Sequence, residues 1–203
     1  GVSLPTNGTC FELGCGVGRI TLWLARTFHN VVAADISASH LALASQAVQR
    51  AGLRNVDLRL VNRLQSLEQL PAFDCFFSLI VLQHNPPPVM RWLLATILSR
   101  LAPGGLGFFQ LPIGLANYGF AAASYLARPP TPDQMETHPL PRDVVLGTIG
   151  HAGCELLEAR EHDCMGTPGS LSMTFLVRKV RVLTAGEAAQ QPGRVTQKSP
   201  LTS

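Results

Sequence analysis

Charged side chains are scarce in this sequence, which gives only 14% of its 203 residues to them and carries a net charge of +3. The basic residues are scattered, apart from a trio at positions 178, 179 and 181, so no stripe of cations is available to neutralise a run of phosphates. We therefore expect no nucleic-acid partner. The composition is 46% hydrophobic, which is typical of a compact globular protein and not of a disordered one.

Long apolar runs and a signal peptide are also missing, so the sequence indicates no membrane partner. The five cysteines form no C-x-x-C pair. This pattern indicates reduced thiols in a cytoplasmic protein and argues against a disulfide framework or a zinc site. No other metal-binding cluster stands out, so no metal is predicted. At this length we expect one α/β domain, and the choice between monomer and homodimer stays open.

Three glycines at every second position, Gly14, Gly16 and Gly18, connect a short apolar segment to an apolar-periodic helix within residues 9–28. Glycine can take a positive φ and lets a ligand lie directly on the backbone, and the following helix points free N–H groups at that ligand. The dinucleotide fingerprint needs a third glycine at position 19, which holds Arg19, and a P-loop needs Gly-Lys-Ser/Thr after the glycines. Both patterns are absent, which leaves a different cofactor site or a purely structural turn.

The glycine stretch resembles the first motif of the class I S-adenosylmethionine-dependent methyltransferases, E/D-x-G-x-G-x-G, with Glu12 as its acidic residue. The resemblance implies that the turn contacts S-adenosylmethionine and, after transfer, S-adenosylhomocysteine. It also implies that Glu12 receives the ammonium group of the cofactor, directly or through water. Asp35, at the end of the second predicted strand, would then accept hydrogen bonds from both ribose hydroxyls, because an ionised carboxylate only accepts.

The contacts to adenine follow the family pattern less closely. The family often places an acidic residue just after the third strand, where this sequence has Asn62. We expect the side-chain carbonyl of Asn62 and the backbone N–H of Leu64 to contact the adenine, and Ile36 to pack against it. The full set of predicted cofactor residues is Glu12, Gly14, Cys15, Gly16, Gly18, Arg19, Asp35, Ile36, Asn62, Leu64, Ser78 and Leu79.

Two further resemblances follow along the chain. Residues 73–84 match F-D-x-x-x-S-x-x-V-L-x-H and predict a fourth strand at 73–79 that continues into residues 80–84. Residues 101–105 match L-x-P-G-G ahead of a predicted fifth strand at 106–111. The resemblance implies an α/β fold, a Rossmann-like three-layer αβα sandwich. Its mostly parallel seven-stranded sheet would have the order 3-2-1-4-5-7-6, with an antiparallel last strand.

We expect the methyltransferase domain to occupy residues 1–182 and a flexible tail to follow at 183–203. Only 8 residues precede the first predicted strand, which suggests that the sequence is trimmed from a longer chain. Residues 112–140 interrupt the minimal fold with prolines, aromatic residues and ionisable groups. A long insertion after the carboxyl end of a strand predicts an acceptor pocket or a lid. The alternative is an exposed connection without chemistry.

The predicted reaction is methyl transfer from S-adenosylmethionine to a small-molecule acceptor, with O-methylation of a hydroxyl, by in-line displacement. A base that removes the hydroxyl proton would assist that reaction. His84 is the first candidate, because it follows the fourth predicted strand, and His138 and Glu136 in the insertion are the second. The alternative is a cofactor-binding but catalytically inactive interaction module, which turnover on any acceptor would exclude.

Overall fold

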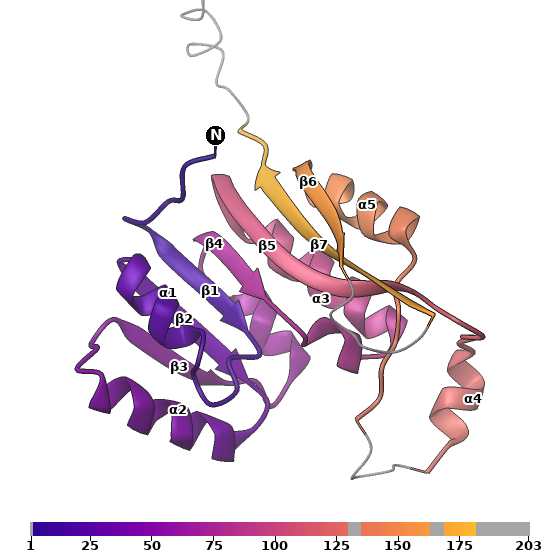
Figure 1. Cartoon of the computed structure of the whole chain (residues 1–203), viewed down its shortest axis with the longest axis horizontal. Helices are drawn as coiled ribbons and strands as arrows, with labels where there is room; N and C mark the ends of the chain where they lie inside the picture. Colours follow the sequence, from indigo (N-terminus) through magenta and orange to yellow (C-terminus); the bar gives the residue numbers. More distant parts are fainter. Residues whose placement is uncertain (1, 130–134, 163–168, 182–203) are drawn as a thin grey trace, which may run out of the picture.

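The alternation of apolar segments and amphipathic helices produces one mixed sheet in the computed structural model, which describes residues 2–129, 135–162 and 169–181. The strands of this sheet lie in the order β3-β2-β1-β4-β5-β7-β6, and β7 runs antiparallel to both of its neighbours (Figure 1). Both features confirm the predicted topology. The strands are β1 Thr9–Leu13, β2 Asn30–Asp35, β3 Val56–Leu60, β4 Phe73–Ser78, β5 Leu101–Leu115, β6 Cys154–His162 and β7 Ser170–Lys179.

Helices connect most of these strands, and their ends follow from local sequence. The hydroxyl of Ser37 accepts a hydrogen bond from the N–H of His40 and thereby caps the second helix. Pro87 lies in the first turn of the third helix, where proline removes no helical hydrogen bond. The helices are α1 Thr21–Thr27, α2 Ala38–Arg50, α3 Pro87–Ser99, α4 Ala122–Ala127 and α5 Arg142–His151, with 3-10 helices η1 Leu64–Gln69 and η2 Leu82–His84.

A row of buried phenylalanines lies across one face of the sheet, beneath α3 and α5. Phe11, Phe76, Phe109 and Phe175 belong to the adjacent strands β1, β4, β5 and β7, and each is 0% exposed. The ring centroids of successive members lie between 5.4 and 6.2 Å apart. Burying one such side chain contributes about 1.5–3 kcal/mol, so this row is a main source of stability.

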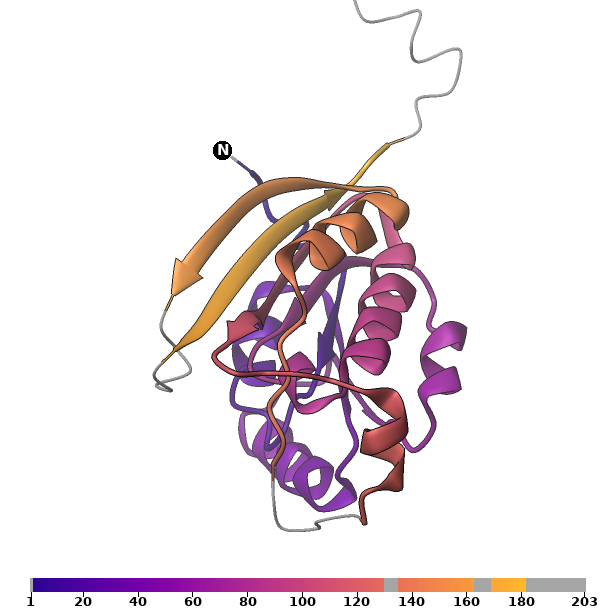
Figure 2. The ribbon, with the colours of Figure 1, turned by 90° about the vertical axis from the view of Figure 1, so that its right-hand side faces the viewer.

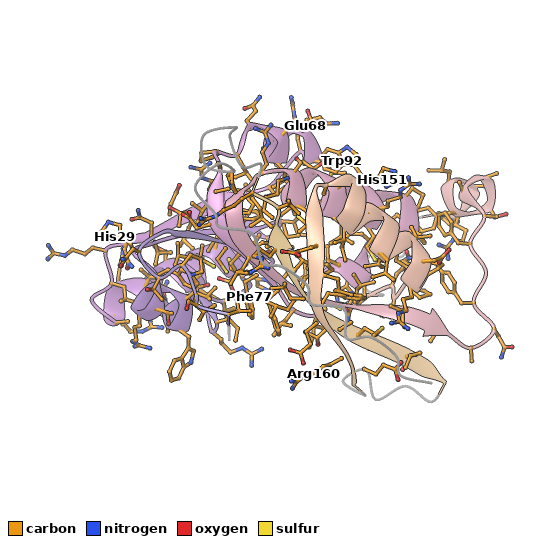
Figure 3. The ribbon with its side chains drawn as sticks, turned by 90° about the horizontal axis from the view of Figure 1, so that it is seen from above. His29, Glu68, Phe77, Trp92, His151 and Arg160 are labelled. Atoms are coloured by element: carbon orange, nitrogen blue, oxygen red, sulfur yellow. The ribbon has the colours of Figure 1, made fainter. Side chains whose placement is uncertain are left out.

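The two faces of the sheet are covered by different helices. Figure 2 shows α3 and α5 on the same side, and Figure 3 shows the side chains of Trp92 on α3 and His151 on α5 on that side too. The other face packs against α1 and α2 through a smaller apolar cluster that includes Leu24 and Phe28. These helices leave the middle of the sheet half-covered, where Phe77 and Phe108 stack at 5.5 Å.

The fourth strand is shorter than the sequence predicts. β4 ends at Ser78, and residues 80–84 turn away from the sheet instead of extending it. Ile80 has a φ of 57°, a left-handed conformation that is unfavourable for a β-branched residue. Its N–H donates to Oε1 of the buried Gln110 at 3.0 Å, which helps to hold this turn. An apolar run alone does not distinguish a buried strand from a strand followed by a tight turn.

The fifth strand is longer than the sequence predicts. β5 begins at Leu101, which pairs with Phe73. The register of its pairing with β4 shifts between Phe73 and Cys75, and the Pro-Gly-Gly segment lies within the strand. It then continues to Leu115, so the insertion begins later than residue 112. The predicted tail at 183–203 lies outside the described residues.

Candidate functional site

The glycine turn lies at the carboxyl edge of β1, where the sequence predicts a cofactor. Gly14 and Gly16 have φ values of 76° and 53°, in the region that favours glycine. A Cβ atom on Gly14 would lie 2.2 Å from Cγ2 of Val81, so Val81 packs directly on the turn. A Cβ atom on Gly16 would meet nothing within 4 Å, so a ligand can rest on this backbone. A Cβ atom on Gly18 would lie 3.1 Å from the Cβ of Ala44 on α2, so this glycine lets the turn pack closely against that helix.

Asp35 ends β2 beside this turn and is only 9% exposed. Its Oδ2 accepts a hydrogen bond from the N–H of Gly16 at 2.8 Å, and its Oδ1 accepts one from the N–H of Ser37 at 2.8 Å. A carboxylate oxygen has two lone pairs, so both atoms retain acceptor capacity for ribose hydroxyls. The same carboxylate therefore fixes the turn and fits the predicted sugar contact.

Glu12 lies on β1 beneath the turn and is 3% exposed. Burial raises the pKa of its carboxyl from 4.5 to about 7. The hydrogen bond that Thr21 Oγ1 donates at 2.6 Å acts in the opposite direction, and the charge of Asp35 raises the pKa further. A nearby cation would favour the ionised carboxylate. The carboxyl therefore suits an ammonium group, reached directly or through water as the sequence predicts.

Apolar side chains remain exposed beside the turn. Ile36 is 81% exposed, Ile80 is 54% exposed, and Val17 and Leu79 are each 37% exposed. These residues follow the carboxyl ends of β1, β2 and β4, which are neighbouring strands. Large apolar side chains gathered at one exposed edge are typical of a ligand site. Ile36 and Leu79 are both predicted cofactor residues.

The remaining predicted cofactor residues differ in how they face this edge. Ser78 is buried and donates its hydroxyl to the carbonyl of Leu13 at 3.1 Å, so it supports the end of β1. The side chain of Cys15 is buried in the core cluster beneath α1, so the residue faces the turn with its backbone. Arg19 and Asn62 are exposed, and Leu64 is half-buried at the start of η1.

A second cluster surrounds His138, in the insertion that follows β5. The imidazole is buried at 6% exposure. Its ring lies roughly perpendicular to the rings of Tyr118, Phe120 and Tyr125, with centroid separations of 5.8, 6.1 and 5.9 Å. The sequence places these aromatic residues in one insertion, and the structure shows that they enclose a histidine.

Hydrogen bonds determine the tautomer of the neutral His138 ring. Nε2 lies 2.9 Å from Oε2 of Glu136, and Nδ1 lies 2.6 Å from the hydroxyl of Tyr118. The hydrogen bond from His138 is the main cause of a lowered pKa of Glu136. Burial opposes it, and the hydrogen bond from Tyr125 and the charge of Arg128 lower the pKa further. An ionised carboxylate only accepts, so Nε2 carries a proton, and in the neutral ring Nδ1 accepts the proton of Tyr118. The pair of Glu136 and His138 is therefore arranged as an oriented base.

Residues 81–84, here called the bridge segment, join the two clusters. Val81 packs on Gly14 at one end. At the other end the N–H of His138 donates to the carbonyl of Gln83 at 2.8 Å, and His84 Nδ1 lies 2.8 Å from the carbonyl of Glu136. A carbonyl only accepts, so Nδ1 of His84 carries the proton and Nε2 is its basic atom when the ring is neutral. The glycine turn and the His138 cluster are therefore connected through four consecutive residues.

A cavity of about 620 Å³ opens beside the His138 cluster. This volume suits a small molecule. Both second-choice bases, His138 and Glu136, line it, whereas the lining does not include His84. The insertion, for which the sequence predicts an acceptor pocket or a lid, supplies further residues of the wall that no motif singles out, among them Tyr118, Phe120, Tyr125 and Arg128.

Among the described residues, no group of three or more His, Cys, Asp or Glu side chains is placed to hold a metal ion. Within those residues no helix combines the length and the apolar character that crossing a membrane requires.

Sequence comparison relates the first half of the chain to methyltransferases. A family model described as a methyltransferase domain matches residues 11–105. A ubiquinone biosynthesis O-methyltransferase from Rhizobium rhizogenes is 32% identical over 95 residues, which are 47% of this chain and 37% of that protein. An S-adenosyl-L-methionine-dependent Diels-Alderase from Talaromyces variabilis is 31% identical over 108 residues, 51% of this chain and 36% of that protein. Across the curated relatives the chain spans 23% to 38% of their length.

Solved structures share the fold over most of the chain. A methyltransferase from Methanosarcina mazei superposes with a TM-score of 0.64 at 19% identity, covering 88% of this chain and 95% of that one. The magnesium protoporphyrin IX methyltransferase from Synechocystis, solved with bound S-adenosylhomocysteine, gives a TM-score of 0.63 at 18% identity, covering 87% and 75%. The likeness at this identity is one of fold.

Proposed function

We propose that this chain, which contains a methyltransferase domain with the class I methyltransferase fold, transfers a methyl group from S-adenosylmethionine to a hydroxyl group of a small molecule. The observation that carries the proposal is the bridge segment. It connects a glycine turn suited to the cofactor with a cavity that contains an oriented base. A methyltransferase needs these two sites side by side, because its main task is to align donor and acceptor away from water.

The residues at the carboxyl edge fit the cofactor group by group. Gly16 offers open backbone, Asp35 offers acceptors for two ribose hydroxyls, and Glu12 suits an ammonium group. Ile36 offers an apolar surface for adenine. When bound, S-adenosylmethionine supplies a methyl group on a positively charged sulfur, which leaves as a neutral thioether. Relatives that use this cofactor by name support the same assignment.

We assign the base role to His138 and not to His84. Glu136 orients the His138 ring through its carboxylate, and the ring lines the cavity. The carboxylate also stabilises the imidazolium that forms when Nδ1 takes up a proton. His84 instead ties the bridge segment to the backbone of Glu136 and so positions the base.

Calorimetric titration tests the cofactor assignment directly. We expect micromolar affinity for S-adenosylmethionine and S-adenosylhomocysteine and no measurable binding of NAD. Asp35→Asn keeps an acceptor for the N–H of Gly16 but loses the charge, so it should weaken adenosyl binding at least tenfold while the protein stays folded. Absence of adenosyl binding in folded wild-type protein would refute the proposal. Binding without turnover on any hydroxyl acceptor would favour the inactive interaction module.

A further inference from the structure

The hydroxyl of Tyr118 lies at the base itself. It lies in the wall of the cavity and donates to Nδ1 of His138, the atom that the base must use. Because this hydroxyl occupies Nδ1, an acceptor can reach that atom directly only by displacing it. Displacing it would break a hydrogen bond of 2.6 Å inside an aromatic enclosure.

We propose that Tyr118 is a catalytic residue that relays the acceptor proton to His138, and that the acceptor is a phenol. This inference rests on the proposed function and names the substrate class of that site. The relay uses the hydrogen bonds in their observed arrangement and requires no rearrangement of the wall. The tyrosine oxygen has lone pairs with which it can accept the hydrogen bond of an acceptor hydroxyl.

The reaction combines one methyl transfer with two proton transfers. The acceptor oxygen forms its bond to the methyl carbon while the bond from that carbon to sulfur breaks and its electron pair stays on sulfur. The acceptor proton moves to Oη of Tyr118, and the proton of Tyr118 moves to Nδ1 of His138. The resulting imidazolium faces the Glu136 carboxylate through Nε2, 2.9 Å away. The proton leaves to solvent before the next turnover.

The choice of a phenol follows from the chemistry of the relay. Proton transfer is most effective between groups of similar acidity, and an ordinary tyrosine titrates near 10, as simple phenols do. Burial, followed by the charge of Glu136, raises the pKa of Tyr118, so this residue is a neutral hydroxyl that can accept from the phenol while it donates to His138. An aliphatic alcohol is far less acidic and would transfer its proton uphill. The aromatic rings of Phe120 and Tyr125 in the same wall offer stacking surfaces for an aromatic acceptor.

Local structure holds Tyr118 in this position. Asn117 has a φ of 57°, a left-handed conformation that asparagine tolerates better than most residues. The N–H of Tyr118 donates to the carbonyl of Leu115 at 3.2 Å and closes a turn directly after β5. The sheet therefore sets the direction from which the hydroxyl reaches His138.

Methylation of two phenols that differ in ionisation tests the relay. The probes are a simple alkyl-substituted phenol, which is neutral at the assay pH, and a nitro-substituted phenol, which is already ionised. Benzyl alcohol serves as the aliphatic hydroxyl of similar size. Each is assayed with wild type, Tyr118→Phe and the matched variant Tyr125→Phe, and S-adenosylhomocysteine binding is measured calorimetrically in parallel.

We expect Tyr118→Phe to slow methylation of the neutral phenol about 100-fold and that of the ionised phenol less than threefold, with binding of S-adenosylhomocysteine unchanged. Tyr125→Phe should slow methylation of the neutral phenol far less than Tyr118→Phe does, because its hydroxyl bonds to Glu136 and not to Nδ1. Equal losses for both phenols in Tyr118→Phe would overturn the relay.

Equal methylation of benzyl alcohol and the neutral phenol would overturn the phenol assignment. Adenosyl binding without methylation of either phenol would also overturn it, while leaving the cofactor assignment in place. Absence of adenosyl binding would remove the proposed function itself, and the present inference with it.

Discussion

Replacement of Glu12 by glutamine gives a stability test that needs no substrate. The substitution keeps the shape of the side chain and an oxygen that can accept the hydroxyl of Thr21, 2.6 Å away in the wild type. It removes the carboxyl that must lose its proton in a buried site. Because the pKa of Glu12 rises from 4.5 to about 7 on folding, the native state holds more protons than the unfolded state between these pH values.

The sign and size of the effect follow from this difference. Stability falls as pH rises wherever the native state binds more protons, so the wild type should lose free energy of unfolding between about pH 4.5 and 7. Each tenfold change in the proton equilibrium corresponds to about 1.4 kcal/mol, which gives a total of roughly 3 kcal/mol over this range. The Glu12→Gln variant has no carboxyl at this position, so its free energy of unfolding should increase relative to that of the wild type as pH rises.

Urea unfolding of both proteins at about pH 5 and pH 8 measures the effect. We expect the difference in free energy of unfolding between variant and wild type to shift by roughly 2–3 kcal/mol in favour of the variant at the higher pH. Other titrating groups are common to both proteins and cancel in this comparison. A parallel pH dependence of the two proteins would refute the reasoning that Glu12 is buried with a raised pKa.

Four further substitutions probe the glycine turn, the end of β4 and the base. Gly14→Ala should cost about 2–4 kcal/mol of stability in urea, because it combines a positive φ with a contact to Val81. Gly16→Ala has the positive φ without such a contact, so it should cost about 1–2 kcal/mol. It should also bind S-adenosylhomocysteine at least tenfold more weakly, and equal binding would contradict the assignment of the Gly16 backbone to the cofactor. Gln110→Leu should lower stability by about 1–3 kcal/mol, since it removes the acceptor of the Ile80 N–H, and unchanged hydrogen exchange at that N–H would contradict this role. His138→Gln should lower kcat on a neutral phenol about 100-fold with unchanged adenosyl affinity, and a kcat near that of wild type would contradict the assignment of the base.

The sheet was predictable because local and family patterns agree on it. The glycine stretch, the acidic end of β2 and the apolar run of β4 each predict one element, and together they lead to the observed strand order. The end of β4 was not predictable, because the turn at Ile80 depends on Gln110, thirty residues away in sequence. An apolar run contains no signal of that long-range hydrogen bond.

The candidate site was predictable to different degrees in its two halves. The sequence predicts Asp35 and Gly16 at one cofactor site, and the two residues lie next to each other, joined by the hydrogen bond from the N–H of Gly16. The His138 cluster required the structure, because its members come from both ends of an irregular insertion whose path has no periodic pattern. Sequence reasoning placed His84 first on its position after β4. In the structure His138 lines the cavity and His84 does not, although both histidines contact Glu136.

A crystal structure with bound S-adenosylhomocysteine would test the central claim most directly. The account predicts that the cofactor lies on the backbone of Gly16 with its ribose on Asp35, and that its sulfur faces the cavity lined by Tyr118 and His138. A cofactor bound elsewhere, or a sulfur that faces away from this cavity, would contradict the claim that the bridge segment joins the donor and acceptor sites.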